Sequence, residues 1–166
     1  YTMKTKFTIL SYLLTIVIIG FVFILFRLVP KLFTDPYYGG TIFPKIFLPS
    51  ILIFTLFYLI MGELKNKCIQ LHIESNMLTV KRFWGLQERI IKNSEIDGWK
   101  LSHQTYNHSG REIIFIIKNN NTATTISESY HKNYFEIKSQ IQDSFTYLGY
   151  ERFSYIKDLK EMFKWY

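Results

Sequence analysis

Hydrophobic and polar positions follow three different patterns along this chain. Up to residue 64 apolar residues come in long unbroken runs, from Cys68 they alternate with polar residues, and after His131 they recur every three or four positions. Unbroken apolar runs are typical of membrane-spanning helices, a period of two of β-strands, and a period near 3.6 of amphipathic helices. The pattern therefore predicts a helical membrane part, then a sheet, then helices.

Two apolar runs are long enough to span a membrane. Residues 7–29, FTILSYLLTIVIIGFVFILFRLV, carry a single charge, that of Arg27 near the far end, and as a helix they cover the hydrocarbon core of about 30 Å. A signal peptide would have a shorter apolar region followed by small residues, whereas RLVPKLF follows here, so we expect a retained helix. Residues 46–64, IFLPSILIFTLFYLIMGEL, form the second predicted span, with Pro49 in its first turn, where a missing N–H costs little.

The segment between the two runs predicts a tight turn, because PKLFTDPYYGGTIFPK contains three prolines and the pair Gly39-Gly40. We therefore expect residues 1–64 to form an antiparallel transmembrane hairpin. The segments before the first apolar run and after the second carry four lysines: Lys4, Lys6, Lys65 and Lys67. The opposite end of the hairpin, at the loop, carries three basic residues and one acid: Arg27, Lys31, Lys45 and Asp35. The positive-inside rule then places both termini in the cytoplasm.

Residues 65–150 predict an α+β domain. CIQLHIES and LTVKRFWG alternate like half-buried strands, and the nearly continuous apolar run REIIFIIKN predicts a central strand buried on both faces. In HKNYFEIKSQIQDSFTYLG, apolar residues at helical spacing predict an amphipathic helix closed by Gly149: Tyr134, Ile137, Ile141, Phe145 and Leu148. Short strands followed by one helix predict a curved antiparallel sheet capped by that helix.

The order of these segments resembles the bacterial pleckstrin-homology-like (PH-like) domain of small membrane proteins, which follows a transmembrane hairpin directly. The similarity covers roughly residues 60–150 and rests on ESNMLTV leading into KRFWGLQERIIKNSEIDGWKL, on the EIIFIIKN strand and on the closing helix. The resemblance implies a PH-like fold, a bacterial cytoplasmic (inner) membrane location and a binding or scaffolding role. It implies no catalytic residues.

Residues 151–166, ERFSYIKDLKEMFKWY, predict a second amphipathic helix. Its apolar side presents a candidate partner surface made of Phe153, Ile156, Leu159 and Phe163. Three interpretations remain open: a helix that packs on the domain, a helix that binds a partner, and a helix on the lipid surface with Trp165 at headgroup depth.

The residues that carry chemistry do not form a recognisable catalytic or metal-binding motif. His72, His103, His108 and His131 lack metal-ligand spacing, and Cys68 has no second cysteine to pair with. The chain has no glycine-rich phosphate loop and no spaced nucleophile and base. The net charge of +7 is spread along the chain rather than clustered, which argues against nucleic-acid binding. We therefore expect a non-enzymatic protein without catalytic residues, cofactor or metal.

One basic and aromatic cluster is a candidate surface for lipid headgroups or a partner. It consists of Lys81, Arg82, Trp84, Arg89 and Lys92. Cations beside exposed aromatics at a membrane surface contribute about 1 kcal/mol each toward anionic lipid. The alternative is an array of solvated cross-strand charges with Trp84 in the core.

Only ELKNK separates the second apolar run from the first strand. A linker this short holds the domain within about 20 Å of the bilayer even when fully extended. We therefore predict a membrane-anchored interaction module that binds a protein partner or a second copy of itself. The alternatives are an immunity or regulatory protein that protects against a membrane-targeted toxin, and a sensor of anionic lipid or envelope stress.

Overall fold

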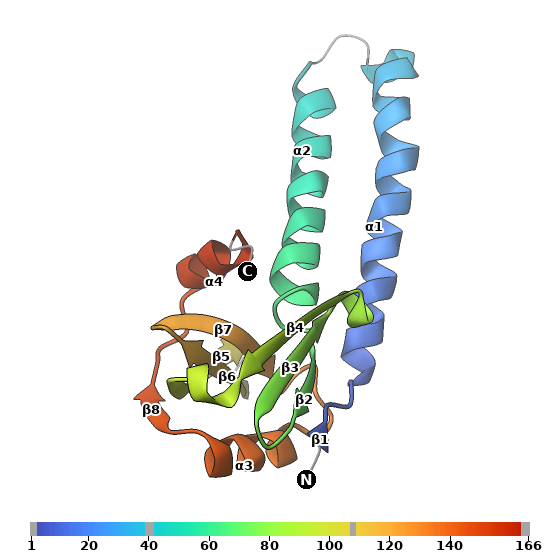
Figure 1. Ribbon diagram of the computed structural model, residues 1–166. Coiled ribbons are helices and arrows are strands. Elements are labelled where there is room, and N and C mark those ends of the chain that lie inside the picture. The colour runs from blue at the N-terminus through green and yellow to red at the C-terminus, as the bar shows by residue number, and fades with distance from the viewer. Residues whose placement is uncertain (1–2, 39–41, 107–108, 164–166) are drawn as a thin grey trace.

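The computed structural model describes residues 3–38, 42–106 and 109–163. A long two-helix hairpin stands on a mixed α/β region (Figure 1). Helix α1 (Ile9–Thr34) leads through the short turn η1 (Pro36–Tyr38) to the tip of the hairpin. Helix α2 (Ile42–Tyr58) returns and continues into a π-helical segment, η2 (Leu59–Leu64).

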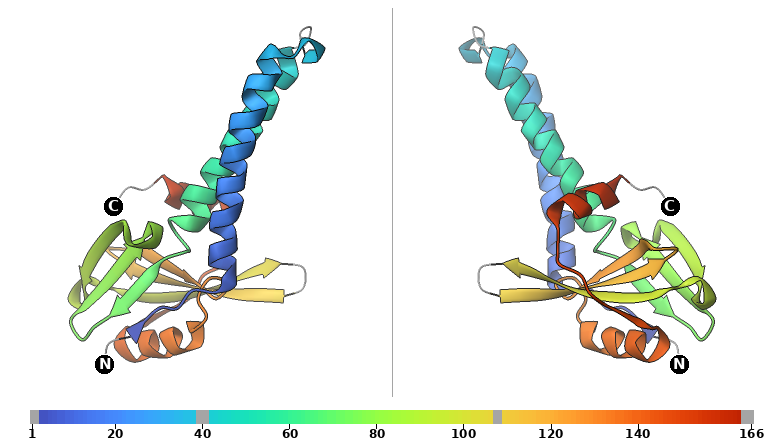
Figure 2. Two further views of the ribbon diagram at one scale, coloured as in Figure 1. Left: turned by 90° about the vertical axis from the view of Figure 1, so that its right-hand side faces the viewer. Right: turned by 90° about the vertical axis from the view of Figure 1, so that its left-hand side faces the viewer.

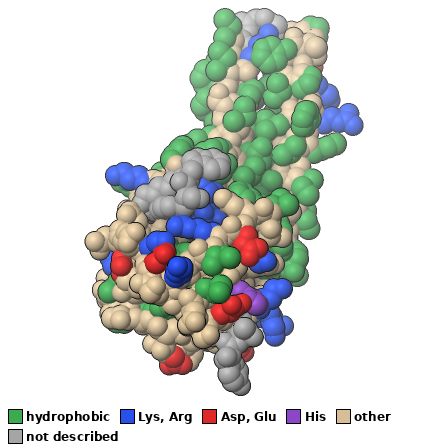
Figure 3. Space-filling view, viewed as in Figure 1, with side chains coloured by type: hydrophobic (Ala, Val, Ile, Leu, Met, Phe, Trp, Pro, Cys, Tyr) green, Lys and Arg blue, Asp and Glu red, His purple; other side chains and the backbone are tan. Residues whose placement is uncertain are grey.

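Both helices of the hairpin are long and apolar enough to cross a membrane, at 26 and 23 residues when η2 is counted with α2. Only 11% and 6% of their most apolar stretches are buried, so neither is a core helix of the α/β region. Figure 3 shows hydrophobic side chains over both helices and charged side chains gathered over the region below them. Helix α1 continues through Pro30, past its predicted end at residue 29, and α2 begins at Ile42, before its predicted start at residue 46. The other two limits are not exceeded, since α1 begins at Ile9 and η2 ends at Leu64.

Two four-stranded sheets form the α/β region. The first has the order β1-β2-β3-β4, from Met3–Lys4, Gln70–Ile73, Met77–Arg82 and Gln87–Lys92. The second has the order β7-β6-β5-β8, from Asn121–Ser127, Ser109–Lys118, Gly98–Tyr106 and Tyr147–Tyr150. Strand β6, the predicted central strand, does lie between two neighbours, and four of its isoleucines are buried.

The core lies between the two sheets and helix α3 (Tyr134–Ser144). Each layer supplies apolar side chains that are almost fully buried, among them Leu71, Val80 and Ile91, Ile114 and Ile116, and Ile137 and Ile141. In Figures 1 and 2, α3 lies at the end of the α/β region that faces away from the hairpin. The prediction of antiparallel strands followed by a helix is confirmed, but the strands form two sheets rather than the single curved sheet that the sequence pattern predicts.

The helix after residue 131 is shorter than the spacing of apolar residues predicted. Helix α3 ends at Ser144, Phe145 is already extended, and Leu148 and Gly149 belong to strand β8, which pairs in parallel with β5. The close approach of β8 depends on Gly98, where a Cβ would lie 2.2 Å from the carbonyl oxygen of Thr146. Phe145 is buried from an extended backbone, so its apolar character did not mean that the helix continued.

The N-terminal residues before α1 are part of the sheet. Strand β1 pairs antiparallel with β2, the Thr5 N–H donates to the Leu71 carbonyl at 3.1 Å, and the Leu71 N–H donates to Thr5 Oγ1 at 2.9 Å. The Lys6 N–H donates to Asn133 Oδ1 at 2.8 Å. The hairpin is therefore an insertion between two neighbouring strands of one sheet, and the α/β region includes residues 3–8 as well as the predicted 65–150.

Helix α4 (Tyr155–Met162) lies beside the base of α2 in every view (Figures 1 and 2). It is shorter than the predicted helix over 151–166, whose last residues, 164–166, lie outside the described part of the chain. Residues 65–67 form a turn that continues from η2 rather than an extended linker. Both attachments of the hairpin to the α/β region are therefore short and ordered.

Candidate functional site at the base of the hairpin

The predicted basic and aromatic cluster does not form one surface, because it divides between the two faces of the first sheet. Directly opposite residues of antiparallel strands point to the same face. Lys81 pairs with Glu88 and Met77 with Lys92 on the outer face, whereas Arg82 pairs with Gln87 and Val80 with Arg89 on the inner face. The inner face is the one that carries the core residues Leu78, Val80 and Ile91.

The two arginines of the cluster therefore point toward the second sheet. Arg82 is only 6% exposed, and its Nη2 donates to the Ala123 carbonyl on β7 at 3.3 Å. Arg89 is half-buried. Neither arginine belongs to an open cationic patch, since strand alternation turns both inward.

The outer face keeps the remaining cations. Lys81 Nζ lies 3.0 Å from Glu88 Oε2, Lys92 is exposed, and Ile90 between them is 60% exposed. This face includes β4, which is the edge strand of the first sheet. The surface therefore combines an apolar side chain, two lysines and an unpaired strand edge.

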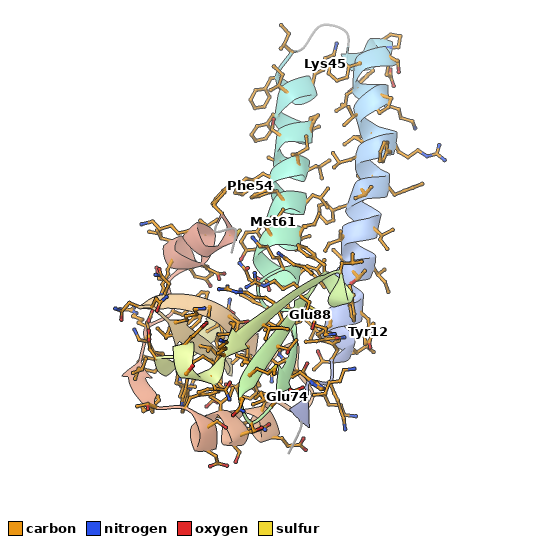
Figure 4. The ribbon with its side chains drawn as sticks, in the orientation of Figure 1. Tyr12, Lys45, Phe54, Met61, Glu74 and Glu88 are labelled. Atoms are coloured by element: carbon orange, nitrogen blue, oxygen red, sulfur yellow. The ribbon has the colours of Figure 1, made fainter. Side chains whose placement is uncertain are left out.

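Trp84 packs against the start of the hairpin rather than in the domain core. Its ring lies 4.7 Å from that of Phe7 and 5.1 Å from that of Tyr12 on α1, measured between centroids. Trp84 and Phe83 both have positive φ, at 59° and 49°, which is unfavourable for bulky side chains. The contact with α1 holds the short turn η3 (Phe83–Gly85) in this conformation, beside Tyr12 in Figure 4.

The apolar residues of the C-terminal segment also divide in two. Met162 is 2% exposed and packs against Gly62 of η2, where an added Cβ would lie 3.1 Å from Met162 Cε. Ile156, Leu159 and Phe163 of the predicted partner surface are 69%, 37% and 65% exposed, and Phe153 is half-buried. Helix α4 thus contacts η2 through Met162, and the rest of its apolar side is exposed.

A buried charge cluster joins η2 to α4 at the base of the hairpin. Lys67 Nζ lies 2.8 Å from Glu63 Oε1 and 3.0 Å from Asp158 Oδ2, and the Lys67 side chain is 2% exposed. Burial by itself would lower the pKa of Lys67, but the two carboxylates raise it well above its usual range. The two carboxylates therefore favour the charged form of Lys67, and its contacts with Glu63 and Asp158 link α4 to the end of η2.

Two further polar contacts extend this cluster into the α/β region. The Tyr130 hydroxyl donates to Glu63 Oε2 at 2.7 Å, and burial together with that carboxylate raises the pKa of Tyr130. Lys65 Nζ donates to the Met162 carbonyl at the C-terminal end of α4 at 3.2 Å. Burial and the neighbouring Arg82 lower the pKa of Lys65.

An open pocket of about 560 Å³ lies beside the cluster, between the hairpin base, the second sheet and the start of α4. Its walls include Leu10, Glu63, Arg111, Tyr130 and Tyr155. The charged groups in these walls are engaged within the protein, Glu63 with Lys67 and Tyr130, and Arg111 with Glu128 at 3.0 Å. The pocket is therefore a structural crevice at the junction with its charges already compensated.

The histidines lie apart in the described chain. His131 is 2% exposed, and its two ring nitrogens lie 2.8 Å from the Ser127 and Ile69 carbonyl oxygens, so it ties β7 to the start of β2. Within residues 3–38, 42–106 and 109–163, no three His, Cys, Asp or Glu side chains are grouped to hold a metal ion. His108, Trp165 and Gly39-Gly40 lie outside the described residues.

Sequence reasoning missed the charge cluster itself. The sequence places Lys65 and Lys67 in the flank of the second apolar run and predicts no ion pair for them, whereas in the structure both are 1% exposed. The available signal was Glu63, an acid four residues before Lys67, which is the spacing of a helical ion pair. Asp158 carried no such signal, because its place beside Lys67 depends on how α4 docks.

Comparison with known proteins identifies no relative of this chain. No family model, curated protein or solved structure matches the chain.

Proposed function

We propose that this protein is an integral membrane protein in which α1 and α2 span the bilayer and hold the α/β region at its surface. The observation that carries the proposal is the combination of two apolar helices of spanning length of which only 11% and 6% of the most apolar stretches are buried. In water this surface would be an apolar patch far larger than soluble monomers expose. A bilayer would remove this apolar surface from water, since about 20 apolar helical residues match the thickness of the hydrocarbon core.

The α/β region is proposed to be a PH-like domain. Strands β2–β4 and β5–β7 form two packed sheets and α3 follows them, an arrangement that supports the resemblance noted in the sequence. Strands β1 and β8 are additions to that pattern at the sheet edges. The proposed role is that of such domains, binding rather than catalysis.

We place both termini in the cytoplasm of a bacterial cell, at its inner membrane. The lysines on the domain side, Lys4 and Lys6 among them, favour that orientation. Cys68, which is a buried free cysteine, is compatible with a reducing compartment. The pairing of β1 with β2 supports the same side for both termini whichever way the hairpin is inserted.

The proposed function is to present a fixed face of the domain to a protein partner at the membrane surface. Two short attachments keep the domain at one height and one rotation relative to the hairpin, which suits a partner that is itself bound to the bilayer. The outer face of β3 and β4 is the proposed contact, because it combines Ile90, Lys92 and an edge strand able to pair with another chain.

Cysteine accessibility in intact cells tests the membrane topology. In a Cys68→Ala background, Lys45→Cys lies at the far end of the hairpin and Glu136→Cys on α3 at the opposite end of the molecule (Figure 4 labels Lys45). A membrane-impermeant maleimide should label position 45 from outside the inner membrane and position 136 only after lysis. Labelling of both positions in intact cells, or of neither, contradicts the proposed topology.

A photo-crosslinking residue at position 90 tests the partner face in the same cells. The matched control is position 135, because Phe135 on α3 is exposed to a similar degree, 66% against 60% for Ile90. We expect one discrete crosslinked product at position 90 and none at 135. Equal crosslinking at both positions would remove β4 as the contact.

A further inference from the structure

Helix α4 has an apolar side that its docking leaves uncovered. At 100° per residue, Met162, Tyr155, Leu159, Phe163 and Ile156 follow one another around a single arc of the helix. Only Met162 at one border of this arc is buried, whereas Tyr155, Ile156 and Phe163 are each more than half exposed. An exposed apolar helix face of this kind indicates that lipid or another molecule covers it.

The position of α4 identifies the occupant. Met162 packs on Gly62, near the polar end of the second apolar span, Ile42–Leu64. The Phe163 ring lies 5.6 Å from the ring of Phe57, which is about one and a half helical turns further into that span than Gly62. Phe163 therefore lies inside the depth that the hydrocarbon occupies if the hairpin spans the bilayer.

The exposed surface of α4 is also continuous with the exposed surface of α2. Phe54 projects from α2 on the side where α4 lies (Figure 4), and it is 65% exposed. Phe54, Phe57 and Phe163 thus form one apolar surface that runs from the span onto α4. The charged residues of the helix lie outside the arc: Asp158 is held by Lys67, and Lys157 pairs with Glu151.

We infer that α4 is an interfacial helix that lies in the membrane surface, with Ile156, Leu159 and Phe163 inserted among the lipids. The inference rests on the proposed membrane hairpin and adds a lateral contact to it. Amphipathic helices of this kind bind where acyl chains meet headgroups, and exposed Lys160 borders the arc where anionic headgroups would lie. The domain is then held at the bilayer by α4 as well as by the two ends of the hairpin.

Spin labels on single cysteines test this inference in the full chain. The Cys68→Ala protein carries Ile156→Cys or Phe163→Cys and is reconstituted into vesicles of phosphatidylcholine with a minority of phosphatidylglycerol. Ile53→Cys on α2 is the reference for lipid, since Ile53 is 57% exposed, and Phe135→Cys on α3 is the reference for water. Collision with apolar oxygen is compared with collision with a water-soluble nickel chelate.

We expect the oxygen-to-nickel ratio at positions 156 and 163 to resemble that at 53 and to exceed that at 135 several-fold. Ratios at 156 or 163 that match position 135, with position 53 still in lipid, would overturn the interfacial helix and leave the membrane hairpin intact. Low collision with both reagents at 156 and 163 would mean that a protein surface covers α4, which also overturns the inference. A water-like ratio at position 53 would instead refute the proposed hairpin.

Discussion

Lys67 lies between the carboxylates of Glu63 and Asp158, almost out of contact with solvent. Removing one member of a buried ion pair leaves the other charges uncompensated in a medium of low polarity, so the loss is much larger than for an exposed pair. The three side chains come from η2, the turn after it and α4. Their pairing therefore holds three segments together at the base of the hairpin.

Lys67→Met should lower the free energy of unfolding by about 3–5 kcal/mol. The measurement is tryptophan fluorescence during chemical denaturation of the full chain in detergent micelles. Lys81→Met is the matched control, because the side chains of its pair with Glu88 are 40% and 45% exposed and the expected loss is below about 1 kcal/mol. Equal losses for the two variants would show that the junction pair contributes no more than a surface pair.

Strand β1 is only two residues long, yet it completes the first sheet. Two residues, Met3 and Lys4, complete the edge of the first sheet, and the next residues bond to β2 and to Asn133. Without β1, strand β2 would present an unpaired edge over core residues such as Ile69 and Leu71. The hairpin is thus built into the sheet rather than appended to it.

A soluble α/β region should therefore need residues 3–8. We expect residues 68–151, preceded by residues 3–8 and a flexible Gly/Ser linker, to be monomeric and to melt at a higher temperature than residues 68–151 alone. Size-exclusion chromatography and circular dichroism measure the two properties. A chain with the same linker and a scrambled order of residues 3–8 is the control, and equal melting of all three chains would show that β1 is dispensable.

At the scale of the whole molecule, two short connections and the contact of Trp84 with α1 fix the hairpin to the α/β region. A domain held by one flexible linker samples many orientations, whereas two attachments on neighbouring strands remove most of that freedom. The orientation of the domain relative to the hairpin is consequently set by the fold.

Distances between spin labels measure this rigidity. In a Cys68→Ala background, labels at Lys31→Cys near the hairpin tip and Glu136→Cys on α3 should give a single narrow distance distribution. Inserting Gly-Gly after both Thr8 and Lys65 should broaden it strongly, while the same insertion in the turn at Asn119 should leave it unchanged. A distribution that is already broad without insertions would contradict a rigid attachment.

Much of the secondary structure could be predicted because it depends on residues close together in the sequence. Alternation in β2 and β3 and the apolar run in β6 each follow from which neighbours face the core. The candidate surface was predicted less well: Lys81, Arg82, Trp84, Arg89 and Lys92 were grouped by proximity in the chain. Strand alternation, which is also visible in the sequence, separates Arg82 and Arg89 from the lysines.

Two apolar helices followed by strands and helices could be inferred from the sequence alone, because run length and periodicity are local properties. The folded structure was needed to show that the hairpin is inserted between β1 and β2, that Lys67 meets Asp158, and that α4 turns Met162 inward and Phe163 outward. Each of these depends on contact between segments far apart in the chain. A two-residue strand or a single ion pair has no local pattern, since its energy comes from the distant partner that folding brings to it.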